Sequence, residues 1–152
     1  MVAQPPSLPP PFAPDIMRCV AGAARTYHVP RILVLAIIKS ESDGNRNVVN
    51  VNRNGTIDVG AMQINTIWQQ ALEIKYRIRS ATFHITHNTC YNIQVGTWLL
   101  SNEINAALRH GAGFWEGVGN YHSHKPAENR RYQNQVAANM KWLERNTNWS
   151  YY

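Results

Sequence analysis

The chain has 152 residues, of which 44% are hydrophobic and 16% are charged. That length allows one domain with a buried core and is too short for two, so we expect a single globular unit over residues 15–152. Fifteen Lys and Arg against nine Asp and Glu give a net charge of +6, which favours acidic polymers such as nucleic acid, anionic lipid or an anionic cell wall.

Several classes of protein are disfavoured by the chain as a whole. The basic residues are scattered, which argues against a nucleic-acid-binding tail. The longest apolar run, residues 32–38, is far shorter than the roughly 20 residues of a membrane span, so it predicts a core helix and no stable membrane insertion. Neither a charged n-region nor an apolar h-region opens the chain, so we expect a cytosolic protein or one whose signal peptide has been removed.

Six prolines among the first fourteen residues predict an extended lead over residues 1–14. Apolar residues at three- and four-residue spacing then predict two helices. We expect Asp15 to cap the first, which runs to about Tyr27, and Pro30 to lie in the first turn of the second, which runs to about Ser40. The second helix is apolar nearly all round, so it should be central.

Short β-prone runs over residues 48–59 flank Asn54-Gly55, the pair typical of a two-residue hairpin turn. We therefore expect one small hairpin here. Asn65 is expected to cap a short helix, and a polar, less regular segment should follow to about Thr86.

The C-terminal half of the chain predicts three further helices. A long one starts at about Thr89 and ends at Gly111, a natural C-terminal cap; a short helix and a loop follow over residues 114–124; Pro126 then opens the last helix. We expect the inward positions to be Cys90, Ile93, Thr97, Leu100, Ile104, Ala107 and Leu108 on the long helix, and Tyr132, Val136, Met140 and Leu143 on the last. The pattern predicts a mainly α fold with one small β-hairpin and no internal repeat.

The two cysteines, Cys19 and Cys90, are 71 positions apart and lack the close spacing of zinc sites or thioredoxin-like motifs. They are either a disulfide or two buried thiols. If bonded, they would stabilise the fold by roughly 4 kcal/mol and would imply an oxidising compartment.

Two carboxylates stand out by their positions. Glu41 ends the apolar helix, and a carboxyl group held among apolar side chains has its pKa raised toward the range of a general acid; a surface charge at the helix end is the alternative. Asp58 follows the predicted turn in an otherwise uncharged stretch. A hairpin arm packed beside the helix end would place the two on opposite sides of a cleft, the arrangement that breaks glycosidic bonds.

The segment ESDGNRNVVNVNRNGTIDVGAMQINTIW, from Glu41 to Trp68, resembles the active-site segment of chicken-type lysozymes, with Glu and Asp 17 positions apart. The chain from about Asp15 to about Tyr132 resembles lytic transglycosylases with a soluble-lytic-transglycosylase domain. Within that family it resembles the small enzymes of conjugation and of type III and type IV secretion systems. The resemblance is carried by ES at 41–42, GAMQIN at 60–65, CYNIQVGTWLL at 90–100 and FWEGVGNYHSH at 114–124.

This resemblance implies a lysozyme-like fold and cleavage of the β-1,4 bond between N-acetylmuramic acid (MurNAc) and N-acetylglucosamine (GlcNAc) in peptidoglycan. Glu41 would be the catalytic acid and then the base, and the product would carry a 1,6-anhydro ring. The runner-up is a hydrolysing muramidase, a glycoside hydrolase in which Asp58 acts as nucleophile or electrostatic partner. Asp58 is therefore a second candidate catalytic residue.

The resemblance also implies further site residues. Tyr121 would lie beside the carboxyl group of Glu41, and Ser42, Met62 and Gln63 would contact or shape the sugar site. Cys19 and Cys90 would form a disulfide. The chain departs from the family at residues 122–124, HSH in place of the usual N-A-G, which puts the floor of the site there in doubt.

On this basis we expect a monomer without cofactor or metal. It would be exported to the periplasm or secreted after loss of a signal peptide, would act on peptidoglycan strands, and would serve secretion or conjugation machinery. A wall-binding assembly factor without catalysis is an alternative. Such a protein would be expected to lack the glutamate, and this chain retains Glu41. A metal-dependent hydrolase built on the histidine pairs at 84 and 87 and at 122 and 124 lacks a further ligand to complete a recognisable site.

The aromatic residues divide into two expected groups. Trp68 and Trp98 are expected in the core, because most aromatic residues at helical spacing are buried. Tyr91, Trp115 and Tyr121 are better placed for the substrate groove.

Overall fold

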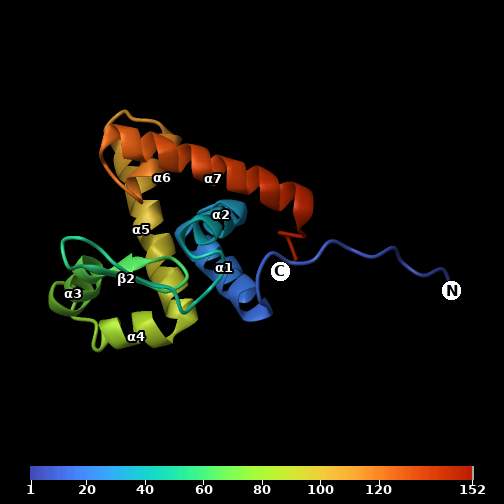
Figure 1. Ribbon diagram of the computed structural model, residues 1–152, viewed down its shortest axis with the longest axis horizontal. Helices are drawn as coiled ribbons and strands as arrows, with labels where there is room; N and C mark the ends of the chain where they lie inside the picture. Colours follow the sequence, from blue (N-terminus) through green and yellow to red (C-terminus); the bar gives the residue numbers. More distant parts are fainter. Residues whose placement is uncertain (152) are drawn as a thin grey trace.

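Seven helices and a three-stranded sheet make up the part of the chain that this computed structural model describes, residues 1–151. In chain order they are α1 (Pro14–Tyr27), α2 (Arg31–Glu41), β1 (Val49–Val51), β2 (Ile57–Val59), β3 (Ile64–Asn65), α3 (Thr66–Ile74), α4 (Ala81–His87), α5 (Thr89–Arg109), α6 (Phe114–Asn120) and α7 (Pro126–Asn146) (Figure 1). The prediction of a mainly α fold is confirmed. Strand β3, however, was not expected.

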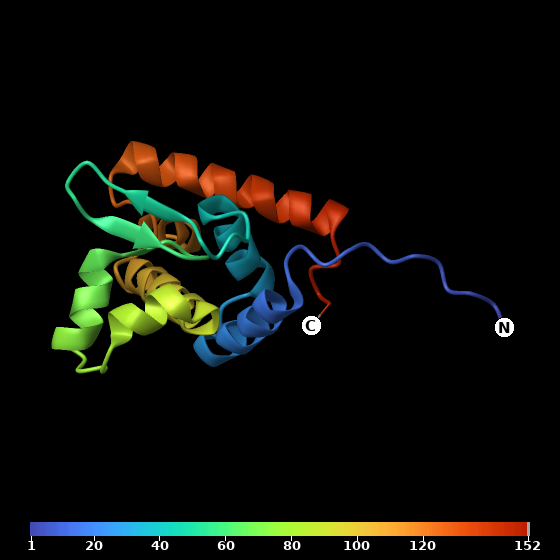
Figure 2. The same ribbon diagram turned by 60° about the horizontal axis from the view of Figure 1, so that its bottom comes forward.

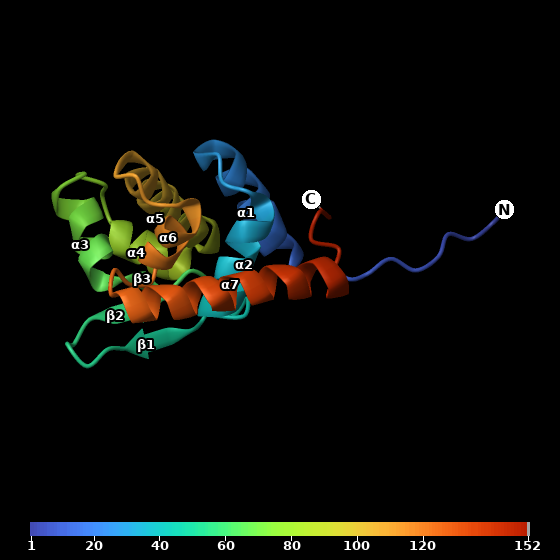
Figure 3. The ribbon, with the colours of Figure 1, turned by 90° about the horizontal axis from the view of Figure 1, so that it is seen from above.

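Helix α2 forms the centre of the core. All of its residues from Ile32 to Ile38 are buried, as its continuous apolar run predicts. Helices α1 and α7 pack against it, and Figure 3 shows α7 lying across it. Beyond this apolar run, α2 ends with Lys39, Ser40 and Glu41, so Glu41 is its last helical residue.

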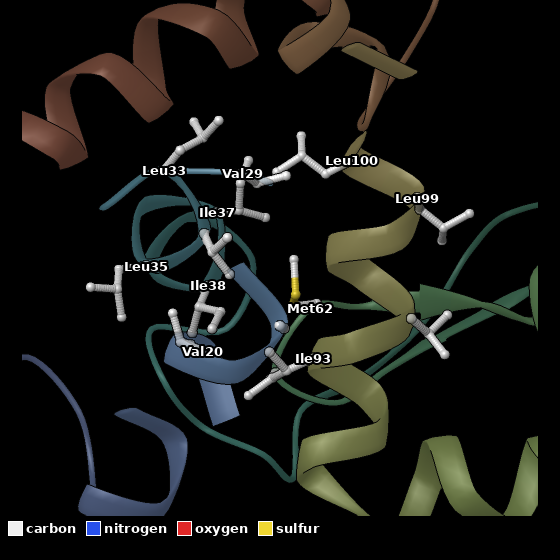
Figure 4. Packing of buried hydrophobic residues seen from close by; sticks show 14 of the residues in the cluster. Val20, Val29, Leu33, Leu35, Ile37, Ile38, Met62, Ile93, Leu99 and Leu100 are labelled. Atoms are coloured by element: carbon white, nitrogen blue, oxygen red, sulfur yellow. The ribbon is translucent and has the colours of Figure 1, made fainter. Parts of the chain in front are cut away.

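Met62, in the turn between β2 and β3, fills the space between α2 and α5 (Figure 4). Its side chain is completely buried. Gly96 on α5 makes room for it, since a Cβ added there would lie 2.5 Å from the Met62 sulfur. This close approach sets the distance between the sheet and α5.

The sheet is antiparallel in the order β1-β2-β3, with Asp58 on the central strand opposite Asn50 on one side and Asn65 on the other. The predicted two-residue turn is wrong. The backbone N–H of Asn52 donates to the carbonyl of Thr56 at 2.8 Å. The loop between them therefore has three residues, 53–55, and Gly55 has φ of 83°. A type I turn closed by a left-handed residue needs this third position, and glycine supplies it at little steric cost.

The predicted helix starts have mixed outcomes. Asn65 caps α3, accepting from the amide of Ile67 as expected. The prediction that Asp15 caps α1 is wrong: Ala13 holds that position, and the Asp15 carboxylate in the first turn receives two hydrogen bonds from Arg46 at 2.6 and 2.9 Å. The partner of Asp15 lies 31 positions away, so local sequence could not reveal it.

Helix α4 falls in the stretch that was expected to be irregular. Its buried residues are Ala81 and Ile85 alone, a single pair four positions apart, which is too short a pattern to indicate a helix. On α5, the expected inward position Leu108 is 53% exposed. Leu108 lies one turn beyond Ile104, in the last turn of α5, and is left exposed there.

The side chain of Asn92 on α5 forms hydrogen bonds to three other segments. It is 1% exposed, and its amide nitrogen donates to the carbonyls of Val59 at 2.9 Å and Ile85 at 3.2 Å. Its amide oxygen accepts from the backbone of Met62 at 3.0 Å. One buried amide therefore holds β2, α4 and the turn after β2 against α5.

Cys19 and Cys90 form a disulfide between α1 and α5, as the family resemblance implied. The first nine residues are exposed and run away from the body of the molecule (Figure 2). The base of this arm is held where the amide of Asn148 donates to the carbonyl of Pro9 at 2.8 Å. Within residues 1–151, no helix combines the length and apolar character needed to cross a membrane.

Replacing both Cys19 and Cys90 by Ala should lower the free energy of unfolding by about 4 kcal/mol, because the bond closes a long loop in the unfolded chain. Urea unfolding monitored by circular dichroism measures this. Wild-type protein in reducing buffer is the matched control and should lose the same amount. Equal stability of wild type and double variant in oxidising buffer would contradict the assignment.

Candidate active site

A cleft of about 840 Å³ opens between the sheet, α5 and the start of α7. Glu41 and Asp58 both line it. The remaining lining comes from four places: the hairpin loop after β1, the segment from Gln63 through β3 into α3, Leu99 and Glu103 on α5, and residues 120–125 with Glu128. In Figure 1 the strands lie at the lower left and the start of α7 at the upper left, at the same end of the molecule but apart from one another.

Glu41 occupies the cleft because it is the last residue of the buried helix α2. The pKa of its carboxyl group is raised from 4.5 to about 7, mainly by burial and also by the negative charge of Asp58. The hydroxyl of Tyr132 on α7 opposes this shift by donating to Oε1 at 2.7 Å. Near neutral pH the group is therefore divided between its acid and carboxylate forms, as a residue that both gives and takes a proton requires.

Asp58 is held by side-chain amides on both sides. Asn52 donates to Oδ2 at 2.9 Å and Asn65 donates to Oδ1 at 2.8 Å. Asn65 lies directly opposite Asp58 on β3 and also caps α3, so the same side chain fixes both the carboxylate and the helix. The sequence prediction placed Asp58 on the second hairpin arm, and the structure has it there, on the wall of the cleft that contains Glu41.

Tyr121 also lines the cleft, immediately after α6. Its hydroxyl donates to the carbonyl of Met62 at 2.7 Å. Burial raises the pKa of Tyr121 well above its usual value, and the charges of Glu41 and Asp58 raise it further, so the phenol stays protonated. Tyr121 is thus near both carboxylates but bonded to the turn that precedes β3.

Ser42 and Met62, two of the expected site residues, are not part of the cleft surface. Ser42 donates to the carbonyl of Ala61 at 2.7 Å and so joins the end of α2 to the turn after β2. Met62 is completely buried, and neither residue lines the cleft.

Gln63 does line the cleft. Its amide nitrogen donates to the carbonyls of Val48 at 3.1 Å and Gly60 at 2.9 Å, and its oxygen accepts from Asn50 at 2.8 Å. Gln63 has φ of 54°, a left-handed conformation that favours glycine. The Gln63 side chain therefore links the residue before β1 to the residue after β2, and it is also part of the cleft surface.

Sequence reasoning missed Tyr132 as a site residue. Its spacing with Val136 and Leu143 is that of a core position, and it is indeed only 4% exposed. Burial raises its pKa well above the usual tyrosine value, so it remains a hydrogen-bond donor to Glu41. No local pattern distinguishes a core tyrosine from one whose hydroxyl reaches a carboxylate 91 positions away.

The aromatic residues were partly misassigned. Trp68 was expected in the core but is 37% exposed and lines the cleft, because the short helix α3 buries Gln69 and Leu72 instead. Tyr91 and Trp115 were expected near the groove, and neither lines it. Only Tyr121 of the three expected groove residues does so.

Residues 122–124, where the chain departs from the family pattern, all line the cleft. The ring of His122 stacks on that of Tyr132, with centroids 4.9 Å apart and planes at 17°. His124 lies 3.3 Å from a carboxylate oxygen of Glu103 on α5. Across the described residues, His, Cys, Asp and Glu form no group of three or more suited to holding a metal ion.

Comparison with known proteins gives a family match over most of the chain. The family described as Transglycosylase SLT domain matches residues 18–143. Protein IpgF of Shigella flexneri is 36% identical over 115 residues, which cover 74% of this chain and 70% of that protein. Invasion protein IagB of Salmonella typhi is 28% identical over 106 residues, which cover 69% of this chain and 61% of that protein.

The raised pKa of Glu41 predicts how stability depends on pH. Between pH 4.5 and about 7 the folded state holds a proton on Glu41 that the unfolded state has lost, so this residue's contribution to the free energy of unfolding falls as pH rises. Relative to Glu41→Gln, wild type should lose about 2 kcal/mol from pH ~4 to pH ~8, less than the full pKa change implies because the carboxyl group also meets cleft water. Urea unfolding of both proteins at the two pH values measures the difference, and parallel curves would show that the pKa is not raised.

Proposed function

Because the chain belongs to the transglycosylase SLT domain family, it is a lytic transglycosylase, and we propose that it cleaves the MurNAc-β-1,4-GlcNAc bond of peptidoglycan to leave 1,6-anhydro-MurNAc ends. The observation that carries the proposal is Glu41. It is a carboxyl group at the end of a buried helix, in a cleft, with its pKa raised to about 7.

Glu41 would serve both proton transfers of this reaction. In its acid form it donates a proton to the glycosidic oxygen as the bond from that oxygen to C1 of MurNAc breaks, which releases the neutral GlcNAc alcohol. In its carboxylate form it takes the proton of the C6 hydroxyl of the same MurNAc as the C6 oxygen bonds to C1. The cycle consumes no water and returns Glu41 to its acid form, and a pKa near the working pH suits both steps.

Asp58 would stabilise the positive charge that develops on the sugar ring. Its carboxylate lies in the same cleft and already accepts hydrogen bonds from Asn52 and Asn65, so it is held in place before substrate binds. The same placement favours a second candidate function, a hydrolysing muramidase in which Asp58 acts as nucleophile or electrostatic partner and a water ends the reaction. Of the remaining expected site residues, Tyr121 and Gln63 would contact the sugar, and Ser42 and Met62 would position the backbone behind them.

We further propose that the enzyme works in the periplasm, opening the wall for a secretion or conjugation apparatus. The Cys19–Cys90 disulfide supports an oxidising compartment. A relative over most of this chain, IagB, carries the name invasion protein. The net charge of +6 is favourable for binding an anionic wall. A wall-binding factor without catalysis is disfavoured, because it would not need a glutamate with a raised pKa in the cleft.

Replacing Glu41 by Gln should lower the rate of peptidoglycan solubilisation by at least about 10²-fold, because the amide can neither give nor take the proton. The circular dichroism spectrum should be unchanged. Mass spectrometry of muropeptides released by wild type should find ends lighter by one water than reducing ends. Reducing ends instead would establish the hydrolase, and full activity of the variant would refute the role of Glu41.

Replacing Asp58 by Asn separates the two reactions. A transglycosylase should lose less than about tenfold in rate, whereas a hydrolase that depends on this carboxylate should lose about 10²-fold or more. In Asp58→Asn alone, one of the two amide donors would face another donor. The double variant Asp58→Asn with Asn65→Asp is therefore the control, since it restores donor–acceptor pairing while moving the charge to β3.

A further inference from the structure

The segment HSH at residues 122–124 has no part in the mechanism above, although it lines the cleft beside Glu41. The imidazole ring of His122 lies almost flat on the phenol ring of Tyr132, with centroids 4.9 Å apart and planes at 17°. The hydroxyl of that phenol donates to Glu41 at 2.7 Å. A chain of two contacts therefore leads from His122 to the carboxyl group.

The segment is held firmly enough to make the stacking contact a fixed one. Asn129 on α7, 5% exposed, donates to the carbonyl of Ser123 at 3.1 Å and to the side chain of Asn120 at 2.8 Å. The amide of Lys125 donates to the Ser123 hydroxyl at 3.1 Å. On the other side, His124 lies 3.3 Å from Glu103 on α5. Contacts to both α5 and α7 thus flank His122.

The stacking contact affects the position of the Tyr132 hydroxyl, which is the group that contacts Glu41. A phenol ring that tilts moves its hydroxyl off the carboxylate, and a flat ring packed against its face limits that tilt. His122 itself is exposed on the cleft side, so its ring also lies between Tyr132 and cleft water. The charge of His122 is not among the causes of the Glu41 pKa shift, which are burial, the Tyr132 hydroxyl and Asp58.

We propose that His122 is a positioning residue of this active site: its ring packs flat against Tyr132 and holds the phenol hydroxyl on the carboxyl group of Glu41. His122 acts through the shape of its ring and does not exchange a proton with the substrate. The effect on the rate rests on the proposed function, whereas the contact and its effect on Glu41 do not.

Three variants test the proposal. In His122→Ala the ring is lost, the Tyr132–Glu41 hydrogen bond loosens, and the rate of peptidoglycan solubilisation should fall about tenfold. Phenylalanine keeps a flat ring without nitrogen atoms, so His122→Phe should recover most of that loss. In a Tyr132→Phe background, His122→Ala should cause no further loss, because the hydroxyl it positions is already absent.

The pKa of Glu41, followed by NMR of ¹³C-labelled glutamate, gives a readout that needs no turnover. The Tyr132 hydroxyl lowers this pKa, so His122→Ala should raise it, in the same direction as Tyr132→Phe. The neighbouring variant His124→Ala is the matched control and should leave the Glu41 pKa unchanged, because no contact joins His124 to Tyr132 in the described structure.

Other outcomes would overturn the proposal. If His122→Ala leaves the Glu41 pKa unchanged, the ring does not act through Tyr132. If the rate of peptidoglycan solubilisation falls as much in His122→Phe as in His122→Ala, the imidazole nitrogens matter and the ring shape does not. If the fold-losses in rate of His122→Ala and Tyr132→Phe multiply when the two are combined, His122 and Tyr132 act separately. An inactive wild type would refute the proposed function while the NMR comparison still decides the role of His122, and melting curves of each variant separate these effects from unfolding.

Discussion

Burial of α2 is the constraint on which the rest of the structure depends. Its seven residues from Ile32 to Ile38 are apolar without a break, so the helix can be stable only at the centre of the molecule. Glu41 follows three positions later, too close to the core to reach open solvent and far enough to meet the cleft. The raised pKa of this carboxyl group is a direct consequence of where the helix must lie.

The cleft around Glu41 is built largely with uncharged hydrogen-bonding side chains. Asn52 and Asn65 hold Asp58, and Asn92 holds the sheet and α4 against α5. Amides suit this work because each carries both donors and an acceptor and can satisfy several backbone groups while buried. Asparagine adds no charge of its own, so the carboxylates keep their electrostatic effect on one another.

Two tyrosines complete the surroundings of the carboxyl group from different directions. Tyr132 arrives from α7 and bonds Glu41 itself, whereas Tyr121 follows α6 and bonds the turn that carries Met62. Burial and nearby negative charge raise the pKa of both phenols, so both remain donors over the pH range in which Glu41 titrates. The family resemblance pointed to Tyr121 alone, and the direct partner of Glu41 comes from a helix that sequence spacing assigned to the core.

The sequence by itself determined the mainly helical fold, the central helix, the cap at Asn65 and Glu41 as the leading candidate, because each depends on local spacing or a contiguous motif. Only the tertiary structure decided the third strand, the Asp15–Arg46 pair and the contact of Tyr132 with Glu41, whose partners lie 31 and 91 positions apart in the last two cases. Apolar periodicity records which side of a helix is buried. It does not predict the hydrogen-bond partner of a polar group on a buried side chain, because that partner depends on how the helices pack around α2.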